Sequence, residues 1–192
     1  RGAQNEAKKF VDKNSNAVLI DQYDNPAVVR VHEEQTASEI LEDFPNGIDA
    51  FVMGVGTGGT ITGVGKVLKD KFPDTLIVAV EPEESAILSG GKRGNSKIQQ
   101  LGLGFIPKNL KRELIDRVIT VTDEEAFETT KQLASQEGLL LGISSGANVC
   151  ASLQVAKELG EGKTVLTVFC DAGQRYFSLN KLFENRPQTR DH

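Results

Sequence analysis

The sequence predicts a three-layer α/β domain, in which helices cover both faces of a parallel sheet. Helical and strand-like segments alternate along the 192 residues, and the strand-like segments are continuous apolar runs. Strands that are covered on both faces have this composition, and repeated strand–helix units make successive strands parallel. Hydrophobic residues make up 39% and charged residues 26% of the chain, which is typical of a folded domain rather than a disordered one.

The first half of the chain contains turn and capping signals. Asp24-Asn25-Pro26 supplies turn residues, and Thr36-Ala37-Ser38-Glu39 has the spacing of a capping box, which predicts a helix start at Thr36. In order, we expect a polar helix at 5–13, an apolar run at 17–20, the helix that starts at Thr36, a strand at 50–53, a helix after the glycine-rich segment 54–60, and a strand at 76–80.

The second half continues the alternation after one long interruption. Residues 85–111 are rich in glycine and lysine and are expected to form a long loop. After it we expect a strand at 118–121, a helix opened by the capping box Thr122-Asp123-Glu124-Glu125 and ended by Gly138, a helix from Ser144 to Gly160, and a last strand at 164–169. Residues 185–192 are polar and are expected to form a loose tail.

Charge and composition exclude several classes of partner. The formal net charge of -5 argues against a nucleic acid held by a general basic field. No apolar run approaches the roughly 20 residues that a membrane helix needs, and the polar residues 1–7 do not resemble a signal peptide. Cys150 and Cys170 have neither CxxC nor metal-ligand spacing. We therefore expect two reduced thiols in a cytoplasmic protein, with no metal, nucleic acid or membrane as partner.

The strongest local signal is the glycine-rich segment Gly54-Val55-Gly56-Thr57-Gly58-Gly59-Thr60. Glycine lets the backbone approach an anion closely, so that successive N–H groups can point toward it. The helix that follows adds the partial positive charge of its N-terminus, and the threonine hydroxyls are further donors. The segment therefore predicts a phosphate-binding loop.

The loop by itself does not identify the phosphate. Gly54, Gly56 and Gly59 also satisfy the G-x-G-x-x-G pattern of a dinucleotide site, and Glu81 ends the next strand about 20 residues on, where such a site has its ribose-binding acid. The local pattern supports a phosphate monoester and a dinucleotide equally, and glycines at a strand–helix junction can also be purely structural.

Several further motifs narrow this choice because they occur in one order. They are Gly56-Thr57-Gly58-Gly59-Thr60, Val80-Glu81-Pro82, Lys97-Ile98-Gln99, Gly104-Phe105-Ile106-Pro107, Gly142-Ile143-Ser144-Ser145-Gly146 and Gly173-Gln174-Arg175-Tyr176. Together they resemble the C-terminal part of the cysteine synthase (O-acetylserine sulfhydrylase) family, whose members use pyridoxal 5'-phosphate and share the β-family, or fold type II, architecture. The resemblance covers residues 1–183.

The resemblance implies a domain division. Residues 1–25 match a remnant of the smaller N-terminal domain, and residues 26–184 match the large, phosphate-binding domain of the tryptophan-synthase-β-like fold, followed by the tail at 185–192. The family's Schiff-base lysine lies in an N-terminal segment that these 192 residues do not match, and so does the loop that grips the substrate carboxylate. We therefore expect a fragment with no catalytic residue of its own.

The resemblance also implies which residues hold the cofactor. The family's threonine/glycine loop holds the cofactor phosphate, which here implies Gly56, Thr57, Gly58, Gly59 and Thr60. Ser144 matches the serine that faces the pyridine nitrogen. A neutral hydroxyl does not force that nitrogen to stay protonated, so the ring is a weaker electron sink, which suits β-elimination over transamination. Without the resemblance, a helix N-cap explains Ser144 equally well.

Three residues are expected on the substrate side. Gln22-Tyr23 resembles a Gln-Phe pair that lines the substrate side in the family, although Tyr23 alone would more often be a packing residue. The third residue, Gln100, stands where the family usually has glycine, near the mouth of the site. Outside this set, Cys170 replaces a usual proline of the family. His32 and Arg175-Tyr176 are expected to be structural.

The function that the resemblance implies is a pyridoxal-phosphate-dependent β-replacement. A whole enzyme of this type makes L-cysteine from O-acetyl-L-serine and sulfide, as a cytoplasmic homodimer. The alternatives are a non-catalytic scaffold or regulatory fragment, another β-replacement (cystathionine or lanthionine synthesis, or cysteine desulfuration), and an NAD-binding oxidoreductase domain. We also expect the fragment to self-associate.

Overall fold

A four-stranded parallel sheet forms the centre of the molecule. The computed structural model describes residues 2–179. The strands are β1 (Ala50–Gly54), β2 (Leu76–Pro82), β3 (Arg117–Val121) and β4 (Val165–Leu166), in the spatial order β3-β2-β1-β4. All three strand pairs are parallel. The predicted α/β class with a parallel sheet is confirmed.

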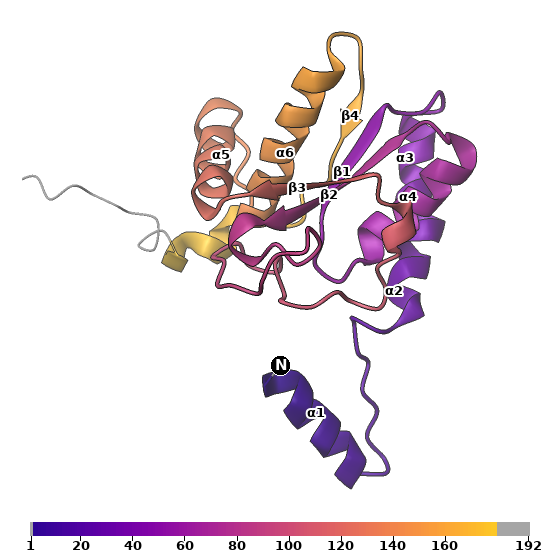
Figure 1. Cartoon of the computed structure of the whole chain (residues 1–192), viewed down its shortest axis with the longest axis vertical. Helices are drawn as coiled ribbons and strands as arrows, with labels where there is room; N and C mark the ends of the chain where they lie inside the picture. The colour runs from indigo at the N-terminus through magenta and orange to yellow at the C-terminus, as the bar shows by residue number, and fades with distance from the viewer. Residues whose placement is uncertain (1, 180–192) are drawn as a thin grey trace, which may run out of the picture.

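Helices cover both faces of the sheet and make three layers (Figure 1). One face is covered by α5 (Asp123–Gln136) and α6 (Ile143–Leu159), and the other by α2 (Pro26–Val31), α3 (Ala37–Asp43) and α4 (Gly59–Lys71).

Alternate residues of β1 point to the two faces of the sheet. Ala50 and Val52 pack in the core beneath α5 and α6, whereas Phe51 and Met53 pack beneath α4. Burial on both faces is why the strand is apolar throughout.

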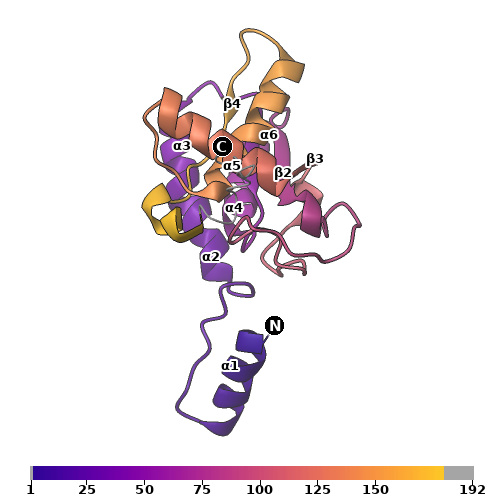
Figure 2. The ribbon, with the colours of Figure 1, turned by 90° about the vertical axis from the view of Figure 1, so that its left-hand side faces the viewer.

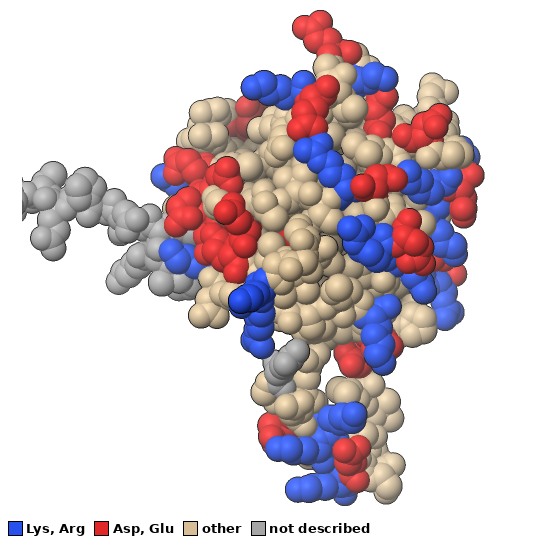
Figure 3. Space-filling model, in the orientation of Figure 1, with Lys and Arg blue, Asp and Glu red and all other residues tan. Residues whose placement is uncertain are grey.

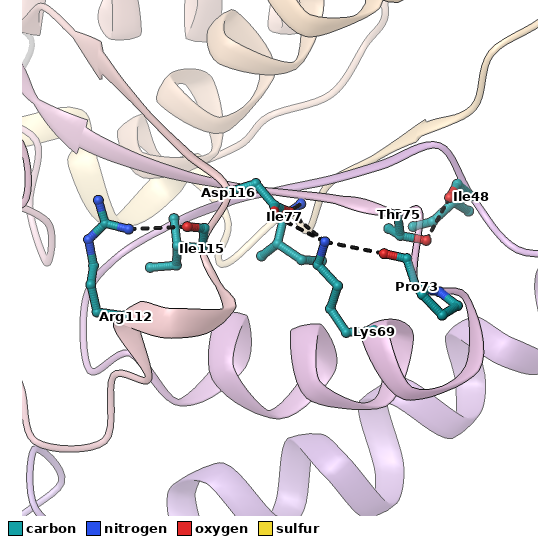
Figure 4. A network of polar contacts seen from close by, with 8 residues as sticks. All are labelled: Ile48, Lys69, Pro73, Thr75, Ile77, Arg112, Ile115 and Asp116. Carbon is teal, nitrogen blue, oxygen red and sulfur yellow. Dashed lines mark hydrogen bonds and ion pairs between the residues drawn. The ribbon is translucent and has the colours of Figure 1, made fainter.

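The polar contacts in Figure 4 fix the end of the sheet at which the strands begin. Asp116, just before β3, accepts the Ile77 N–H at 2.7 Å and pairs with Lys69 near the end of α4 at 2.8 Å. Thr75 donates its hydroxyl to the Ile48 carbonyl at 2.9 Å. These contacts hold the C-terminal end of α4 against the start of the strands, which leaves its N-terminal end at the carboxyl ends of the strands.

The capping box expected at Thr36 is wrong. Residues 26–43 form one continuous helical run, in which α2 passes through a π-helical turn at His32–Thr36 into α3. Thr36 has helical backbone angles and makes no capping bond. Its hydroxyl lies 2.9 Å from Nδ1 of His32 instead. The true start is at Asn25, whose side chain accepts the Ala27 N–H, with Pro26 in the first helical position.

The last strand is shorter than expected. The prediction covered 164–169, but β4 spans only Val165–Leu166. Beyond it, side chains bond to the backbone groups that a longer ladder would use, and Thr167 donates its hydroxyl to the Val52 carbonyl at 2.7 Å. A side chain of α6, described below, occupies the groups that follow.

The other expected elements agree with the structure, with small shifts. The first helix, α1, spans Gly2–Lys13, and α6 begins at Ile143 rather than Ser144. The capping box at Thr122 is present in full, and residues 86–111 have no helix or strand. The expected tail at 185–192 lies outside the described residues.

The N-terminal helix stands apart from the rest of the molecule. Both views show α1 separated from the sheet and its helices by an extended segment (Figures 1 and 2). No residue of α1 is buried. The apolar run at 17–20 is not a strand, and Val18 and Ile20 are 84% and 77% exposed. These side chains form a hydrophobic surface with no partner among the described residues.

Acidic and basic side chains are mixed over the face of the molecule in Figure 3. Acidic side chains gather near α5, whose first turn contains Asp123, Glu124 and Glu125. Negative charge at this end of a helix is favoured by the helix dipole. No described helix is long and apolar enough to cross a membrane.

Candidate cofactor site

The glycine loop lies at the point where the strand order reverses. From β1 the chain proceeds outward through β2 to β3, and later returns to place β4 on the other side of β1. In open α/β sheets, ligands bind at the carboxyl ends of the strands at such a switch point. The segment after Gly54 therefore begins where this sheet offers space to a ligand.

Glycine is required by the loop's own geometry. Gly58 has a φ of +79° and is the N-cap of α4. A Cβ at this position would lie 2.9 Å from the Leu110 Cβ, and one at Gly59 would lie 2.5 Å from the Val28 Cγ1. The first turn of α4, which follows Gly58, has N–H groups with no partner within the helix. The loop can thus present backbone donors and the positive end of α4 to an anion.

A cavity of about 500 Å³ opens beside this loop. Eight of the nine predicted site residues line it: Gln22, Tyr23, Gly56, Thr57, Gly58, Thr60, Gln100 and Ser144. Gly59 does not line it, and instead packs against α2 at Val28. The structure therefore brings together segments that are up to 122 residues apart in the sequence.

Ser144 lies across the cavity from the glycine loop, in the first turn of α6. The N-cap of α6 is Gly142, so the alternative that Ser144 is the cap is wrong. The side chain of Ser144 is only 4% exposed, and it lines the cavity. Cys170 lines the cavity too, and protein atoms packed around its sulfur raise the pKa of the thiol. This end of the cavity is therefore polar but uncharged at neutral pH.

The segment at Gln22 and Tyr23 is fixed to the loop that follows residue 100. The Asn109 side chain donates to the Gln22 carbonyl at 2.7 Å, and the Asn109 N–H donates to the Tyr23 carbonyl at 3.2 Å. The Tyr23 ring meets Phe105 edge-on, with centroids 5.3 Å apart. Tyr23 thus packs and lines the cavity at the same time.

Gln100 has an unusual backbone conformation at the cavity wall. Its φ of +70° is the only positive φ of a non-glycine residue in the described chain. A Cβ at Gly56 would lie 2.9 Å from the Gln100 carbonyl oxygen. A left-handed conformation at a residue other than glycine is strained, and such strain often occurs at ligand sites. Glycine in this place would adopt the same backbone without strain.

His32 supports the loop from behind rather than lining the cavity. Its Nε2 lies 3.1 Å from the Thr60 hydroxyl, and its Nδ1 lies 2.9 Å from that of Thr36. Burial lowers the pKa of this imidazole, so the neutral form predominates at neutral pH. These contacts agree with the expected structural role. Tyr176 is also buried and donates its hydroxyl to Asp171.

The structure does not place the acidic residue of the dinucleotide alternative at the cavity. Glu81 is 3% exposed and does not line the cavity. One of its carboxylate oxygens accepts the Leu88 N–H at 2.7 Å, and the other accepts the N–H and hydroxyl of Ser89. Glu81 therefore holds the following loop and is buried away from the cavity.

Sequence reasoning missed part of the cavity wall. The additional lining residues are Met53, Gly54, Ile61, Leu101, Leu103 and Cys170. Gly54 is the first residue of the glycine-rich segment and Ile61 directly follows it, which is a usable signal. Leu101 and Leu103 belong to the long loop and have no local signal. No lysine lines the cavity, and the described residues contain no cluster of His, Cys, Asp or Glu that could hold a metal ion.

Comparisons with known proteins agree with this geometry. Residues 1–171 match a family model described as pyridoxal-phosphate dependent enzyme. A cysteine synthase from Staphylococcus aureus is 53% identical over 158 residues, which cover 82% of this chain and 51% of the relative. The chain thus spans about half the length of the curated relatives that it matches.

Solved structures are similar as well. The crystal structure of cysteine synthase from Entamoeba histolytica has a TM-score of 0.89 at 38% identity, covering 93% of this chain and 53% of that one. An O-acetylserine-dependent cystathionine β-synthase from Helicobacter pylori has a TM-score of 0.85 at 39% identity, covering 92% and 57%.

Proposed function

We infer the function from one premise: the chain belongs to the family of pyridoxal-phosphate-dependent enzymes. The expectation drawn from the sequence motifs is thereby confirmed at the level of family, fold and cofactor. We propose that the chain supplies the cofactor-binding part of a cysteine-synthase-type enzyme, which makes L-cysteine from O-acetyl-L-serine and sulfide.

The cavity fits this cofactor on its own geometry. A phosphate monoester needs many hydrogen-bond donors around a small anion. The loop from Gly56 to Thr60 brings backbone N–H groups and threonine hydroxyls to the cavity at the N-terminus of α4. The far end of the cavity offers the hydroxyl of Ser144, which suits a ring nitrogen. The convergence of these groups in one cavity at the switch point is the observation that carries the proposal.

We assign binding and orienting roles to the chain's own residues. The glycine loop and the N-terminus of α4 would hold the phosphate. The Ser144 hydroxyl would accept a hydrogen bond from a protonated ring nitrogen or donate one to an unprotonated nitrogen, so it does not fix the charge of that atom. Gln22, Tyr23 and Gln100 form the substrate side of the cavity. When bound, pyridoxal phosphate supplies an electron sink for reactions of an amino acid. Because no lysine lines the cavity, the covalent step requires a lysine from outside these residues.

Cofactor binding is tested by titrating the chain with pyridoxal phosphate and following the change in cofactor absorbance and emission. We expect saturable binding that inorganic phosphate weakens by competition, and no binding of a nicotinamide dinucleotide. A chain that bound the dinucleotide, or that bound pyridoxal phosphate without competition by phosphate, would contradict the proposal.

The activity is tested by joining the chain to the N-terminal part of the Staphylococcus relative. We expect the joined protein to form cysteine from O-acetylserine and sulfide. A joined protein that binds pyridoxal phosphate but forms no cysteine would refute the reaction and favour a non-catalytic scaffold.

A second candidate reaction uses a larger thiol in place of sulfide. The similarity to an O-acetylserine-dependent cystathionine β-synthase favours it, and Gln100 at the cavity wall gives a place where acceptors of different size would be distinguished. The same joined protein discriminates the two reactions when sulfide and homocysteine are compared as acceptors.

We also propose that the chain self-associates as a dimer through its N-terminal segment. Phe10, Val18 and Ile20 are 62%, 84% and 77% exposed, and burying such side chains against a partner is favourable. Sedimentation should show a dimer, and Val18→Asp with Ile20→Asp should convert it to monomer. A monomer at all concentrations would refute this.

The separation of α1 supports the proposed division into residues 1–25 and 26–184. Limited proteolysis should cut first within 14–24 and leave the remainder intact.

The two free cysteines, Cys150 and Cys170, favour a reducing compartment such as the cytoplasm, which cell fractionation would test.

A further inference from the structure

The ladder between β1 and β4 stops at Phe51, although β1 continues to Gly54 in its pairing with β2. The two strands pair in register at Ala50 with Val165 and at Phe51 with Leu166, and the Ala50 N–H donates to the Thr164 carbonyl at 3.1 Å. In a parallel ladder with this register, every second N–H of β1 donates to the residue before its partner. Continued to its end, the ladder would bring the Gly54 N–H to the Val168 carbonyl.

The carboxamide of Asn148 lies between these two groups. Its Oδ1 accepts the Gly54 N–H at 2.8 Å, and its Nδ2 donates to the Val168 carbonyl at 3.0 Å. The side chain comes from α6 and is fully buried, at 0% exposure. One amide therefore replaces a missing bond between two strands and leaves both backbone groups satisfied. Together with the Thr167 hydroxyl on the Val52 carbonyl, this amide occupies the groups that would continue the ladder beyond Leu166, where β4 ends three residues earlier than expected.

The inserted amide separates two walls of the cofactor cavity. Met53 and Gly54 lie on one side of it, and Cys170 on the other, and all three line the cavity. A direct bond between Gly54 and Val168 would bring these walls together. The insertion thus opens the carboxyl end of the sheet at its switch point.

The same residue connects the two ends of the cavity. Gly54 is the first residue of the glycine loop, and Ser144 lies one helical turn before Asn148 on the same face of α6. The hydroxyl of Ser145 accepts the Cys170 N–H at 2.9 Å, which ties the same wall to the same turn of α6. The bond from Asn148 to Gly54 therefore sets the distance between the loop and Ser144.

We propose that Asn148 is a positioning residue of the cofactor site: its amide holds β1 and residues 168–170 apart and fixes the glycine loop relative to Ser144. This inference rests on the proposed function for its consequence, the binding of pyridoxal phosphate. The insertion itself is a property of the chain without any ligand, so the two can be tested separately.

Two substitutions separate the bulk of the side chain from its hydrogen bonds. Asn148→Leu keeps a similar volume but removes both strand bonds, together with the Nδ2 contacts to the sulfurs of Met53 at 3.8 Å and Cys170 at 3.7 Å. Asn148→Asp keeps an acceptor for the Gly54 N–H. Ser152→Ala is the matched control, because Ser152 lies one turn further along α6 and donates its hydroxyl at 2.7 Å to the backbone carbonyl of Asn148. Among the described residues, the Ser152 hydroxyl bonds to this helix carbonyl and to neither strand.

The first measurement is hydrogen exchange of the Gly54 amide by NMR in the ligand-free chain. We expect exchange to be at least tenfold faster in Asn148→Leu, and within twofold of the original chain in Asn148→Asp and Ser152→Ala. Unchanged exchange in Asn148→Leu, with circular dichroism showing a folded chain, would overturn the inserted amide whether or not pyridoxal phosphate binds.

The second measurement is pyridoxal-phosphate titration of the same variants, well below their unfolding temperatures. We expect at least tenfold weaker binding and a shifted cofactor emission maximum for Asn148→Leu, a smaller loss for Asn148→Asp, and less than twofold change for Ser152→Ala. A purely structural role predicts lower thermal stability with unchanged affinity and emission, and that result would overturn the positioning role. If the original chain itself fails to bind pyridoxal phosphate, the proposed function fails, while the exchange result still decides whether the amide is inserted.

Discussion

Replacing Gly58 with alanine tests whether the glycine loop depends on backbone geometry rather than on sequence identity alone. Gly58 has a φ of +79° and forms the N-cap of α4 at the wall of the cavity. The added methyl group would be 2.9 Å from the Leu110 Cβ and 3.1 Å from its backbone N and Cα. Backbone atoms cannot rotate away as the end of a flexible side chain can, so the loop or the segment at Leu110 must move.

The expected loss of stability has two sources. A residue other than glycine in the left-handed region costs about 1–2 kcal/mol. Forcing an extra methyl group against a packed neighbour typically costs a further ~1–3 kcal/mol. Gly58→Ala should therefore lower the free energy of unfolding by about 2–5 kcal/mol, a large part of the ~5–15 kcal/mol that stabilises a typical domain.

The chain contains a matched control for the first source alone. Gly162 has a φ of +78°, and nothing lies within 4 Å of the position that its Cβ would occupy. Gly162→Ala should therefore cost only about 1–2 kcal/mol. Urea unfolding of both variants gives the two free energies, and a pyridoxal-phosphate titration at low temperature gives their cofactor affinities.

The stabilities and affinities of the two variants test this reasoning directly. We expect Gly58→Ala to lose more stability than Gly162→Ala and at least about tenfold in affinity, which corresponds to ~1.4 kcal/mol of binding free energy. Equal losses of stability in both variants would show that the contact with Leu110 has no effect. An unchanged affinity in Gly58→Ala would show that the loop does not bind the phosphate.

Three further predictions follow from single residues. Gln100→Gly should raise the free energy of unfolding by about 0.5–1 kcal/mol in urea, because relief of the left-handed strain exceeds the added entropy of the unfolded chain; a loss would contradict this. Thr122→Ala removes a capping box and should cost about 0.5–2 kcal/mol, against less than about 0.5 kcal/mol for Ser38→Ala at an exposed position of α3. Burial lowers the pKa of His32 from 6.5, so the folded chain binds fewer protons than the unfolded chain, and stability should fall as the pH drops below about 6.5. That fall should be smaller in His32→Gln, and equal slopes for the two proteins would contradict it.

Local patterns in the sequence predicted most of the elements and the loop. The run 50–53 became β1 with one residue added, because a strand buried on both faces must be apolar throughout. The capping box at Thr122 formed because its bonds join residues three apart. The same spacing failed at Thr36, where α2 already continued into the next turns and His32 offered a different partner to the hydroxyl.

The site was predictable only through motifs in one order, and not from local patterns. Glu81 shows why: its position fits a dinucleotide site, but its carboxylate is bonded to Leu88 and Ser89. Nothing in the residues around Glu81 specifies that the following loop folds back over it. Without the ordered motifs, the choice between the two kinds of phosphate would have depended on such contacts between segments.

The sequence by itself determined the succession of strands and helices along the chain, the glycine loop and the family of the chain. Each of these depends on neighbouring residues or on motifs read in order. Only the tertiary structure decided which residues meet in the cavity, why Gln100 adopts a left-handed backbone, and where β4 ends. Those features depend on residues far apart in the chain, such as Asn148 and Gly54, which are 94 residues apart. A buried amide takes the place of a strand bond only when folding brings a helix to the exact gap between two strands, and no local propensity encodes that meeting.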